Sequence, residues 1–90
     1  MKYIVLKRKN LFIPVVLPEF ASHSDFVPKD DDVKVDSAGF FGVIDGEVNV
    51  VSLGSESLNV EPNIERDTLL LTLLLSGYPM SFFLDFDSLD

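Results

Sequence analysis

The sequence predicts an α+β fold: an antiparallel sheet of four to five strands, built from two β-hairpins, with one long helix packed on it. Three stretches lead to this expectation. Tyr3–Leu17 holds two apolar runs around a polar turn, Val35–Asn59 holds two more around an Asp-Gly pair, and Ile64–Ser76 carries the capping signals of a helix. The 90 residues suffice for a single domain, residues 1–90, and we expect about 85–90 to be frayed.

The second hairpin carries the clearest local signal. Phe40–Ile44 is rich in aromatic and β-branched residues, which fit a pleated surface, and valines alternate with polar residues after the turn. Asp45 and Gly46 between the two runs favour a type I′ turn, because both central residues of that turn need positive φ. Gly39 and Gly42 indicate a bulge or a close approach of another backbone.

The first hairpin is expected from two apolar runs, Lys2–Leu6 and Leu11–Leu17. In the turn between them, Asn10 suits a left-handed conformation. Pro14 has no N–H group, so its strand should lie at an edge of the sheet or contain a bulge. After this hairpin, Pro18–Val27 predicts a short helix or an ordered loop.

An acidic run, Asp30–Asp32, separates the two hairpins and is expected to be a solvated linker, because adjacent carboxylates repel one another. It lacks the alternating ligands, the central glycine and the final glutamate of an EF-hand loop, so we predict no calcium site there. Val33–Asp36 alternates again and is expected to begin the strand that continues into the second hairpin.

The long helix is defined by signals at both ends. Asn63 is the expected N-cap, and Glu65 and Asp67 put negative charge into the first turn, where the helix dipole favours it. Gly77 suits the left-handed residue that often ends a helix, and Pro79 prevents further helix.

This helix is apolar around most of its circumference, because leucines fill every position of residues 69–75 except one. A single sheet face cannot cover all of them, so we expect a homo-oligomer. The predicted interface residues come from the helix and from the aromatic tail: Leu70, Leu71, Leu74, Leu75, Phe82 and Phe83. Phe82, Leu84 and Phe86 alternate, which indicates a last strand that adds to the same sheet or to a neighbour's.

Charge and composition exclude several classes of function. The formal charge of −8 and the pI of about 4.3 argue against binding nucleic acid through its phosphates, which requires Lys and Arg. With no cysteine and one histidine, disulfides and thiolate chemistry are excluded, and we predict no metal and no cofactor. The apolar run at 69–75 is far shorter than the roughly 20 residues of a membrane-spanning helix, and no targeting segment is recognised, so we expect a soluble, cytoplasmic protein.

The single histidine lies in a polar stretch, SHSD, at residues 22–25. One interpretation is a small hydrolase in which His23 is a general base oriented by Asp25, with a serine as nucleophile. The other, which we favour, is a polar loop whose histidine caps a backbone group, because no Gly-x-Ser-x-Gly turn is present to aim a hydroxyl. No catalytic residue is therefore assigned.

A turn rich in glycine and serine follows the second hairpin and resembles a small anion-binding nest. Arg66 stands close to it in sequence, at the start of a helix, where anions are favoured. Ser55, Ser57 and Arg66 are therefore the candidate residues for a small anionic ligand. In the alternative interpretation, the serines satisfy local backbone groups and Arg66 pairs with Asp67 or Glu61.

Five short motifs occur in a fixed order: MKYIVLKR at 1–8, PEFASHSD at 18–25, SAGF at 37–40, GSESL at 54–58 and ERD at 65–67. In this order the chain resembles a loose group of small, uncharacterised proteins of phages and prophages. The motifs together span most of the first 70 residues, and the Leu/Phe-rich end from Leu69 onward has no counterpart in the resemblance. The resemblance implies a context rather than an activity: small acidic phage proteins are often accessory factors, including ones that blunt host defences by binding a protein or sequestering a signalling molecule.

Together these observations predict a non-enzymatic binding protein, a phage accessory factor of the anti-defence type, that binds a host protein or sequesters a small anionic ligand in the host cytoplasm. If the partner is a protein, Asp30–Asp32 or the aromatic tail is the expected contact surface. The alternative is a purely structural protein that forms homo-oligomers. A third interpretation is the small hydrolase that uses His23 and Asp25.

Overall fold

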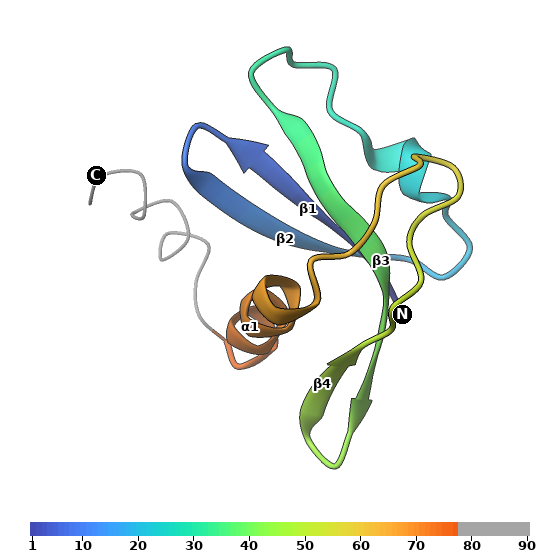
Figure 1. Cartoon of the computed structure of the whole chain (residues 1–90), viewed down its shortest axis with the longest axis vertical. Helices are drawn as coiled ribbons and strands as arrows, with labels where there is room; N and C mark the ends of the chain where they lie inside the picture. The colour runs from blue at the N-terminus through green and yellow to red at the C-terminus, as the bar shows by residue number, and fades with distance from the viewer. Residues whose placement is uncertain (78–90) are drawn as a thin grey trace.

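The computed structural model describes residues 1–77 of the chain. This part contains six elements, in the order β1 (Lys2–Arg8), β2 (Leu11–Leu17), the 3₁₀ helix η1 (His23–Phe26), β3 (Lys34–Ile44), β4 (Glu47–Val50) and α1 (Ile64–Leu75). The strands form one antiparallel sheet, and α1 packs against it (Figure 1), which confirms the predicted α+β class.

The strand order in the sheet is β2-β1-β3-β4. Both predicted hairpins are present, since β1 pairs with β2 and β3 pairs with β4. In addition, β1 pairs with β3, so the two hairpins share one sheet, and β3 runs past both of its neighbours (Figure 1). β2 and β4 are therefore the two edge strands, and Pro14 lies in an edge strand, as its missing N–H requires.

The turns of the two hairpins differ in how well the sequence predicted them. Asp45 and Gly46 have φ values of 53° and 80°, the positive pair of a type I′ turn, as expected. In the first turn the residue with positive φ is Lys9, at 55°, rather than Asn10. The sequence located this turn correctly but not its left-handed residue.

β3 contains a bulge, but not at a glycine. Val5 of β1 lies opposite Ser37, and the next residue, Leu6, lies opposite Val35, so Asp36 is an extra residue on β3. A bulge of this kind bends the strand and takes one side chain out of the regular alternation. Here it leaves Asp36 free to reach a partner outside the sheet.

Gly39 instead serves the second role expected for it, close approach of another backbone. A Cβ atom at this position would lie 3.1 Å from the carbonyl oxygen of Leu53. At Gly42 a Cβ would meet nothing within 4 Å. The loop after β4 can therefore run tightly against β3 only because residue 39 has no side chain.

α1 begins and ends close to where its capping signals place it. The side chain of Asn63 accepts a hydrogen bond from the N–H of Arg66 at 3.4 Å, so Asn63 is the N-cap. Ser76 is the C-cap, and Gly77 has a φ of 89°, the left-handed conformation that glycine accepts without strain. The predicted helix end at Ser76 is one residue too long.

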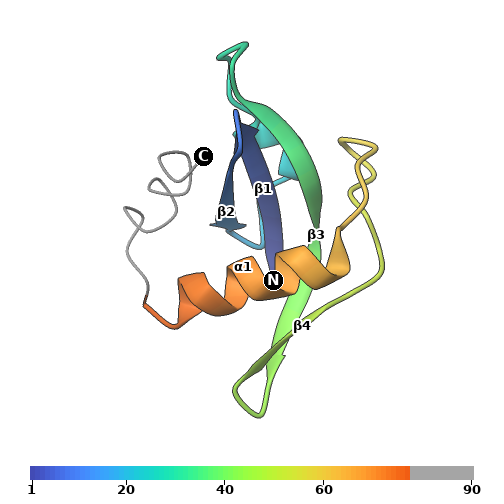
Figure 2. The same cartoon turned by 60° about the vertical axis from the view of Figure 1, so that its left-hand side comes forward.

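The sheet is covered on both faces. α1 lies across one face (Figure 2), where the main core cluster joins the helix to the strands through Tyr3, Val5, Leu11, Phe41, Leu70 and Leu71. Ile4 alternates with Tyr3 and Val5 along β1, so it faces the other side. There it packs with Leu17 and Ala38, and Leu58 and Val60 from the loop before α1 cover them. β1 is consequently buried on both faces.

The leucines of α1 divide into two groups. Leu70 and Leu71 are buried in the core of their own chain, and Leu74 is half-buried against it. Leu75 and Leu69 are 50% and 59% exposed. The apolar surface that α1 leaves open within residues 1–77 is therefore centred on Leu69 and Leu75. Leu70 and Leu71, which were predicted to lie in a subunit interface, pack instead in the core of their own chain.

The remaining interface residues, Phe82 and Phe83, the last strand predicted around them and the frayed end at 85–90 lie outside the described residues. The acidic run Asp30–Asp32 is exposed, as expected of a solvated linker. Within residues 1–77, no helix has the length and apolarity needed to cross a membrane.

Candidate functional site

Arg66, one of the three candidate ligand residues, is held by groups of its own chain. Its guanidinium donates to Asp36 Oδ2 at 2.5 Å, to Ser37 Oγ at 2.9 Å and to Asp67 Oδ1 at 3.0 and 3.3 Å. It also lies over the ring of Phe12, 4.5 Å from the centroid, in a cation–π contact. The arginine thereby ties the first turn of α1 to the bulge of β3 and to β2.

Asp67 is the buried partner in this arrangement, with a fully buried side chain. Besides Arg66, it accepts hydrogen bonds on Oδ2 from the hydroxyl of Tyr3 at 2.6 Å and from the backbone N–H of Asn63 at 2.9 Å. A buried carboxylate is stable only when it is paired and fully hydrogen-bonded, and both conditions hold here. Asp67 therefore links β1, the N-cap of α1 and Arg66.

The same contacts raise the pKa of Tyr3 far above its ordinary value, first because burial disfavours the phenolate, then because the hydroxyl donates to Asp67 and faces its negative charge. In the unfolded chain a tyrosine loses its proton near pH 10. Below that pH the stabilisation is fully present. As the pH rises past about 10, only the unfolded state releases the proton, so the free energy of unfolding is expected to fall.

This fall can be measured by denaturant unfolding at a series of alkaline pH values, with Tyr3→Phe as the control. The variant lacks the titrating group, so its free energy of unfolding should change less above pH about 10 than that of the native chain. Lysine titration affects both proteins alike. Parallel pH profiles for the two proteins would mean that Tyr3 does not hold its proton in the folded state.

The two candidate serines lie in the loop between β4 and α1. Ser55 is buried and its hydroxyl accepts a hydrogen bond from the N–H of Leu58 at 3.2 Å, while Ser55 Oγ and Ser57 Oγ are 3.2 Å apart. Ser55 also forms an isolated β-bridge with Val60. These local hydrogen bonds match the alternative interpretation of the sequence, in which the serines satisfy nearby backbone groups. The joint role of Ser55, Ser57 and Arg66 in one anion site stays a prediction, and the structure assigns Arg66 other partners.

Gly54 allows this loop to close. A Cβ at residue 54 would lie 2.6 Å from the carbonyl oxygen of Val60, a distance that no side chain tolerates. The two arms of the loop therefore touch through backbone alone. A small hollow of about 210 Å³ lies on the side of Ser55 and Asn59, whereas Ser57 faces a larger cavity.

His23 and Asp25, the residues of the hydrolase interpretation, are turned to different partners. His23 is buried, and its Nε2 lies 2.9 Å from the carbonyl oxygen of Gly39. Asp25 accepts a hydrogen bond from the backbone N–H of Ser22 at 2.8 Å, at the start of η1. A backbone carbonyl thus orients the histidine, which agrees with the favoured interpretation that His23 caps a backbone group. The aspartate caps η1.

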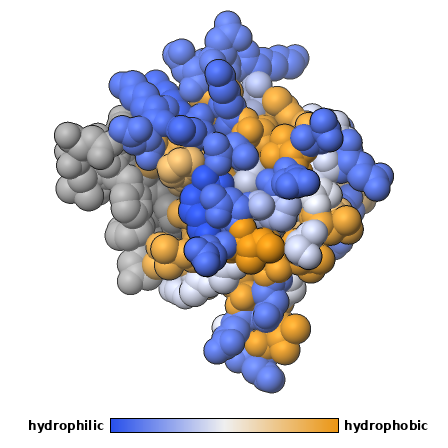
Figure 3. Space-filling view, viewed as in Figure 1, coloured by the Kyte–Doolittle hydropathy of each residue, from blue (hydrophilic) through white to orange (hydrophobic). Residues whose placement is uncertain are grey.

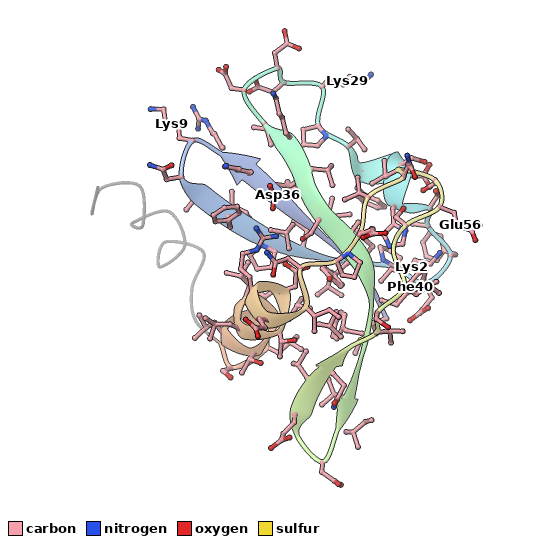
Figure 4. The ribbon with its side chains drawn as sticks, in the orientation of Figure 1. Lys2, Lys9, Lys29, Asp36, Phe40 and Glu56 are labelled. Carbon is pink, nitrogen blue, oxygen red and sulfur yellow. The ribbon has the colours of Figure 1, made fainter. Side chains whose placement is uncertain are left out.

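The larger cavity, of about 470 Å³, lies between η1, the start of β1 and the loop after β4 (Figure 4). Its apolar lining comes from three side chains, Phe20, Phe40 and Leu53. Its polar lining comes from Lys2, Ser22, His23, Glu56 and Ser57, together with the backbone of Gly54. A concave site of mixed apolar and convergent polar groups is the usual form of a small-molecule site.

Lys2 supplies the ammonium group of this lining, and it is half-buried. Its ammonium donates to the carbonyl oxygen of Ala21 at 2.7 Å, which uses one of its three N–H groups. Within residues 1–77, the ion pairs involve only the N-terminus and Arg66, so no carboxylate lies within ion-pair distance of Lys2. In Figure 4, Glu56 reaches outward from its loop, whereas Lys2 and Phe40 lie further in.

Phe20 stands at the cavity as an unusual surface residue. It is 93% exposed, although a phenylalanine side chain gains roughly 1.5–3 kcal/mol when it is buried. A bound molecule that contacts this ring would recover part of that energy. The described residues leave the ring uncovered.

Comparison of the chain with protein-family models, with curated protein sequences and with solved structures finds no match. The cavity residues Lys2, Phe20 and Phe40 were not among the predicted site residues. Lys2 and Phe40 have the pattern of ordinary strand residues, and only the pairing of β1 with β3 brings them next to η1. Phe20 alone carried a signal, as an aromatic residue in a polar loop.

Proposed function

We propose that the protein is a non-enzymatic binding protein that takes a small anionic ligand into the cavity between η1 and the loop after β4. The observation that carries this proposal is the ammonium of Lys2, half-buried at the cavity without a carboxylate partner in residues 1–77 of an acidic chain. A cation in this setting attracts a carboxylate or phosphate more strongly than a lysine in bulk water does.

The rest of the lining suits such a ligand. The hydroxyls of Ser22 and Ser57 can donate to the same anion, and Phe20 and Phe40 offer apolar surface to the body of the molecule. Binding is supported over catalysis because His23 and Asp25 have separate partners, and within residues 1–77 the hydrogen-bond partner of the histidine is a backbone carbonyl rather than a hydroxyl.

The proposal is tested by titrating the full ¹⁵N-labelled chain with benzoate and, in parallel, with benzyl alcohol. Benzoate is expected to shift the amide signals of Lys2, Ser57 and the glycines that flank the cavity, and benzyl alcohol to shift them less. Lys2→Met keeps the length of the side chain and removes the charge, so it should weaken benzoate binding by at least about tenfold.

Lys34→Met is the matched control, since Lys34 is an exposed lysine of β3 that does not line the cavity. It should bind benzoate as the native chain does. Benzoate shifts that are absent, or that survive unchanged in Lys2→Met, would overturn the proposed site.

A phage accessory role remains the leading context for this binding, and it rests on the ordered motifs described above. In such a role the protein sequesters its ligand in the host cell rather than converting it. A non-covalent site for one anion, on a protein with net charge −8, is compatible with capture of a small molecule and not with wrapping of nucleic acid.

A second candidate function, assembly into homo-oligomers, is favoured by a separate observation. Leu69 and Leu75 expose half or more of their surface on α1, and Val43 and Ile44 are exposed at the tip of the β3–β4 hairpin, which projects from the body in Figure 3. Apolar side chains of this size at two projecting places favour self-association. This candidate does not exclude the ligand site.

A further inference from the structure

The ring of His23 is held in one orientation by two contacts. Its Nε2 lies 2.9 Å from the carbonyl oxygen of Gly39, and the ring forms a T-shaped pair with Phe40, with centroids 5.1 Å apart. A carbonyl oxygen only accepts hydrogen bonds, so Nε2 must carry the hydrogen. In the neutral ring this leaves Nδ1 as a hydrogen-bond acceptor.

Nδ1 is an acceptor without a partner. Within residues 1–77, the ring makes its hydrogen bond through Nε2 and none through Nδ1. In this part of the chain, every side-chain nitrogen or oxygen that solvent cannot reach has a hydrogen-bond partner. Nδ1 is therefore open to solvent. Since His23 is only 4% exposed and lines the larger cavity, the opening of Nδ1 lies in that cavity.

From this we infer the chemical class of the ligand: an aromatic acid with an N–H or O–H donor on its ring, the donor being bound by Nδ1 of His23. The inference rests on the proposed function and extends it. The acid group meets Lys2, the ring meets Phe20 and Phe40, and the donor meets Nδ1 of His23, an acceptor whose ring is already oriented.

A fixed acceptor that a bound ligand covers selects strongly between related ligands. A ligand with the donor forms a hydrogen bond that needs no rearrangement, because the ring of His23 is already oriented. A ligand of the same shape with a methyl group in place of the hydrogen displaces water from Nδ1 and leaves the acceptor unpaired, which is the costly situation for a buried polar group.

The experiment uses a matched pair of probes, indole-3-carboxylate and 1-methylindole-3-carboxylate, titrated into the full chain. The first has a ring N–H and the second has a methyl group at the same atom. We expect the N–H probe to bind about tenfold more tightly. Long-range ¹H–¹⁵N spectra of the His23 ring should show hydrogen on Nε2 in the free protein and a shift of Nδ1 on binding.

His23→Gln is the informative variant, because the glutamine amide retains an N–H donor for Gly39 and removes the acceptor at Nδ1. It is expected to bind both probes equally, with the affinity that the native chain has for the methylated one. Ser52→Ala, a change at an exposed serine outside the cavity lining, should keep the native preference.

The outcomes separate this inference from the proposed function. Equal binding of both probes to the native chain, with benzoate binding intact, overturns the role of His23 and leaves the anion site standing. A preference for the N–H probe that persists in His23→Gln also overturns it. If neither probe nor benzoate binds, the cavity is not an anion site and both proposals fall.

Discussion

Replacing Asp67 by alanine is expected to lower the free energy of unfolding by about 3–5 kcal/mol, the largest effect of any single polar substitution in residues 1–77. The reason is the number of groups that this one carboxylate satisfies. Its loss leaves the buried hydroxyl of Tyr3 and the N–H of Asn63 without acceptors, and it removes one anion from Arg66. For a domain of this size, that is a large part of the total stability.

Denaturant unfolding monitored by circular dichroism measures the effect. Asp25→Ala is the matched control, because Asp25 also accepts a backbone N–H at the start of a helical segment but is exposed. Its cost should be that of an ordinary cap, about 1 kcal/mol. Similar losses for both variants would show that the contacts of Asp67 are not the main link between α1 and the sheet.

Replacing Leu71 by alanine is expected to lower the free energy of unfolding by about 2–5 kcal/mol, because its side chain is completely buried among Tyr3, Val5 and Phe41. Leu75→Ala, on the same helix, should change stability by about 0.5 kcal/mol or less, since half of its surface is exposed. The same residue type, helix and substitution make the pair a test of which face of α1 packs on the sheet.

This pair also separates the two explanations of a leucine-rich helix. If α1 joins subunits through its open face, Leu75→Ala should shift sedimentation toward smaller species while the spectrum of the folded chain is unchanged. A loss of folding in Leu75→Ala as large as that in Leu71→Ala would contradict the division of leucines seen here.

The sequence predicted the local structure well because the signals were local. The positive φ of Asp45 and Gly46 follows from the geometry of a two-residue turn, and the Asn63 cap and Gly77 follow from the unpaired groups at helix ends. Where several residues of a turn can take the left-handed conformation, as with Lys9 and Asn10, composition alone did not decide between them.

What the sequence did not predict depends on contacts between distant segments. The pairing of β1 with β3 joins residues 27 to 38 positions apart in the sequence, from Lys7 with Lys34 to Lys2 with Phe40, and no pattern within either strand specifies it. Arg66 illustrates the result: its neighbours in sequence suggested an anion site or an ion pair with Asp67, but Asp36 and Phe12 come to it only through the bulge of β3 and the position of β2. The cavity around Lys2 and His23 is a product of the same pairing.

The leucine count misled in a different way. At one helix turn per 3.6 residues, so many leucines must surround the axis, and Leu69 and Leu75 do stay exposed within residues 1–77, whereas a second covering surface stays a prediction. It could not tell which leucines the sheet itself covers. That depends on the rotation of α1 about its axis, which the contacts of Asp67 and Arg66 set at the first turn.

The measurement that tests the ligand site most directly is native mass spectrometry of the full chain purified from cells, first under gentle and then under harsh activation. We expect the gentle spectrum of the native protein to show a discrete additional mass, the size of one small molecule per chain, that harsh activation removes and that Lys2→Met lacks. A native protein that shows only the mass of its polypeptide under gentle conditions, or an additional mass that Lys2→Met retains in full, would contradict the proposal that this cavity captures a small anion.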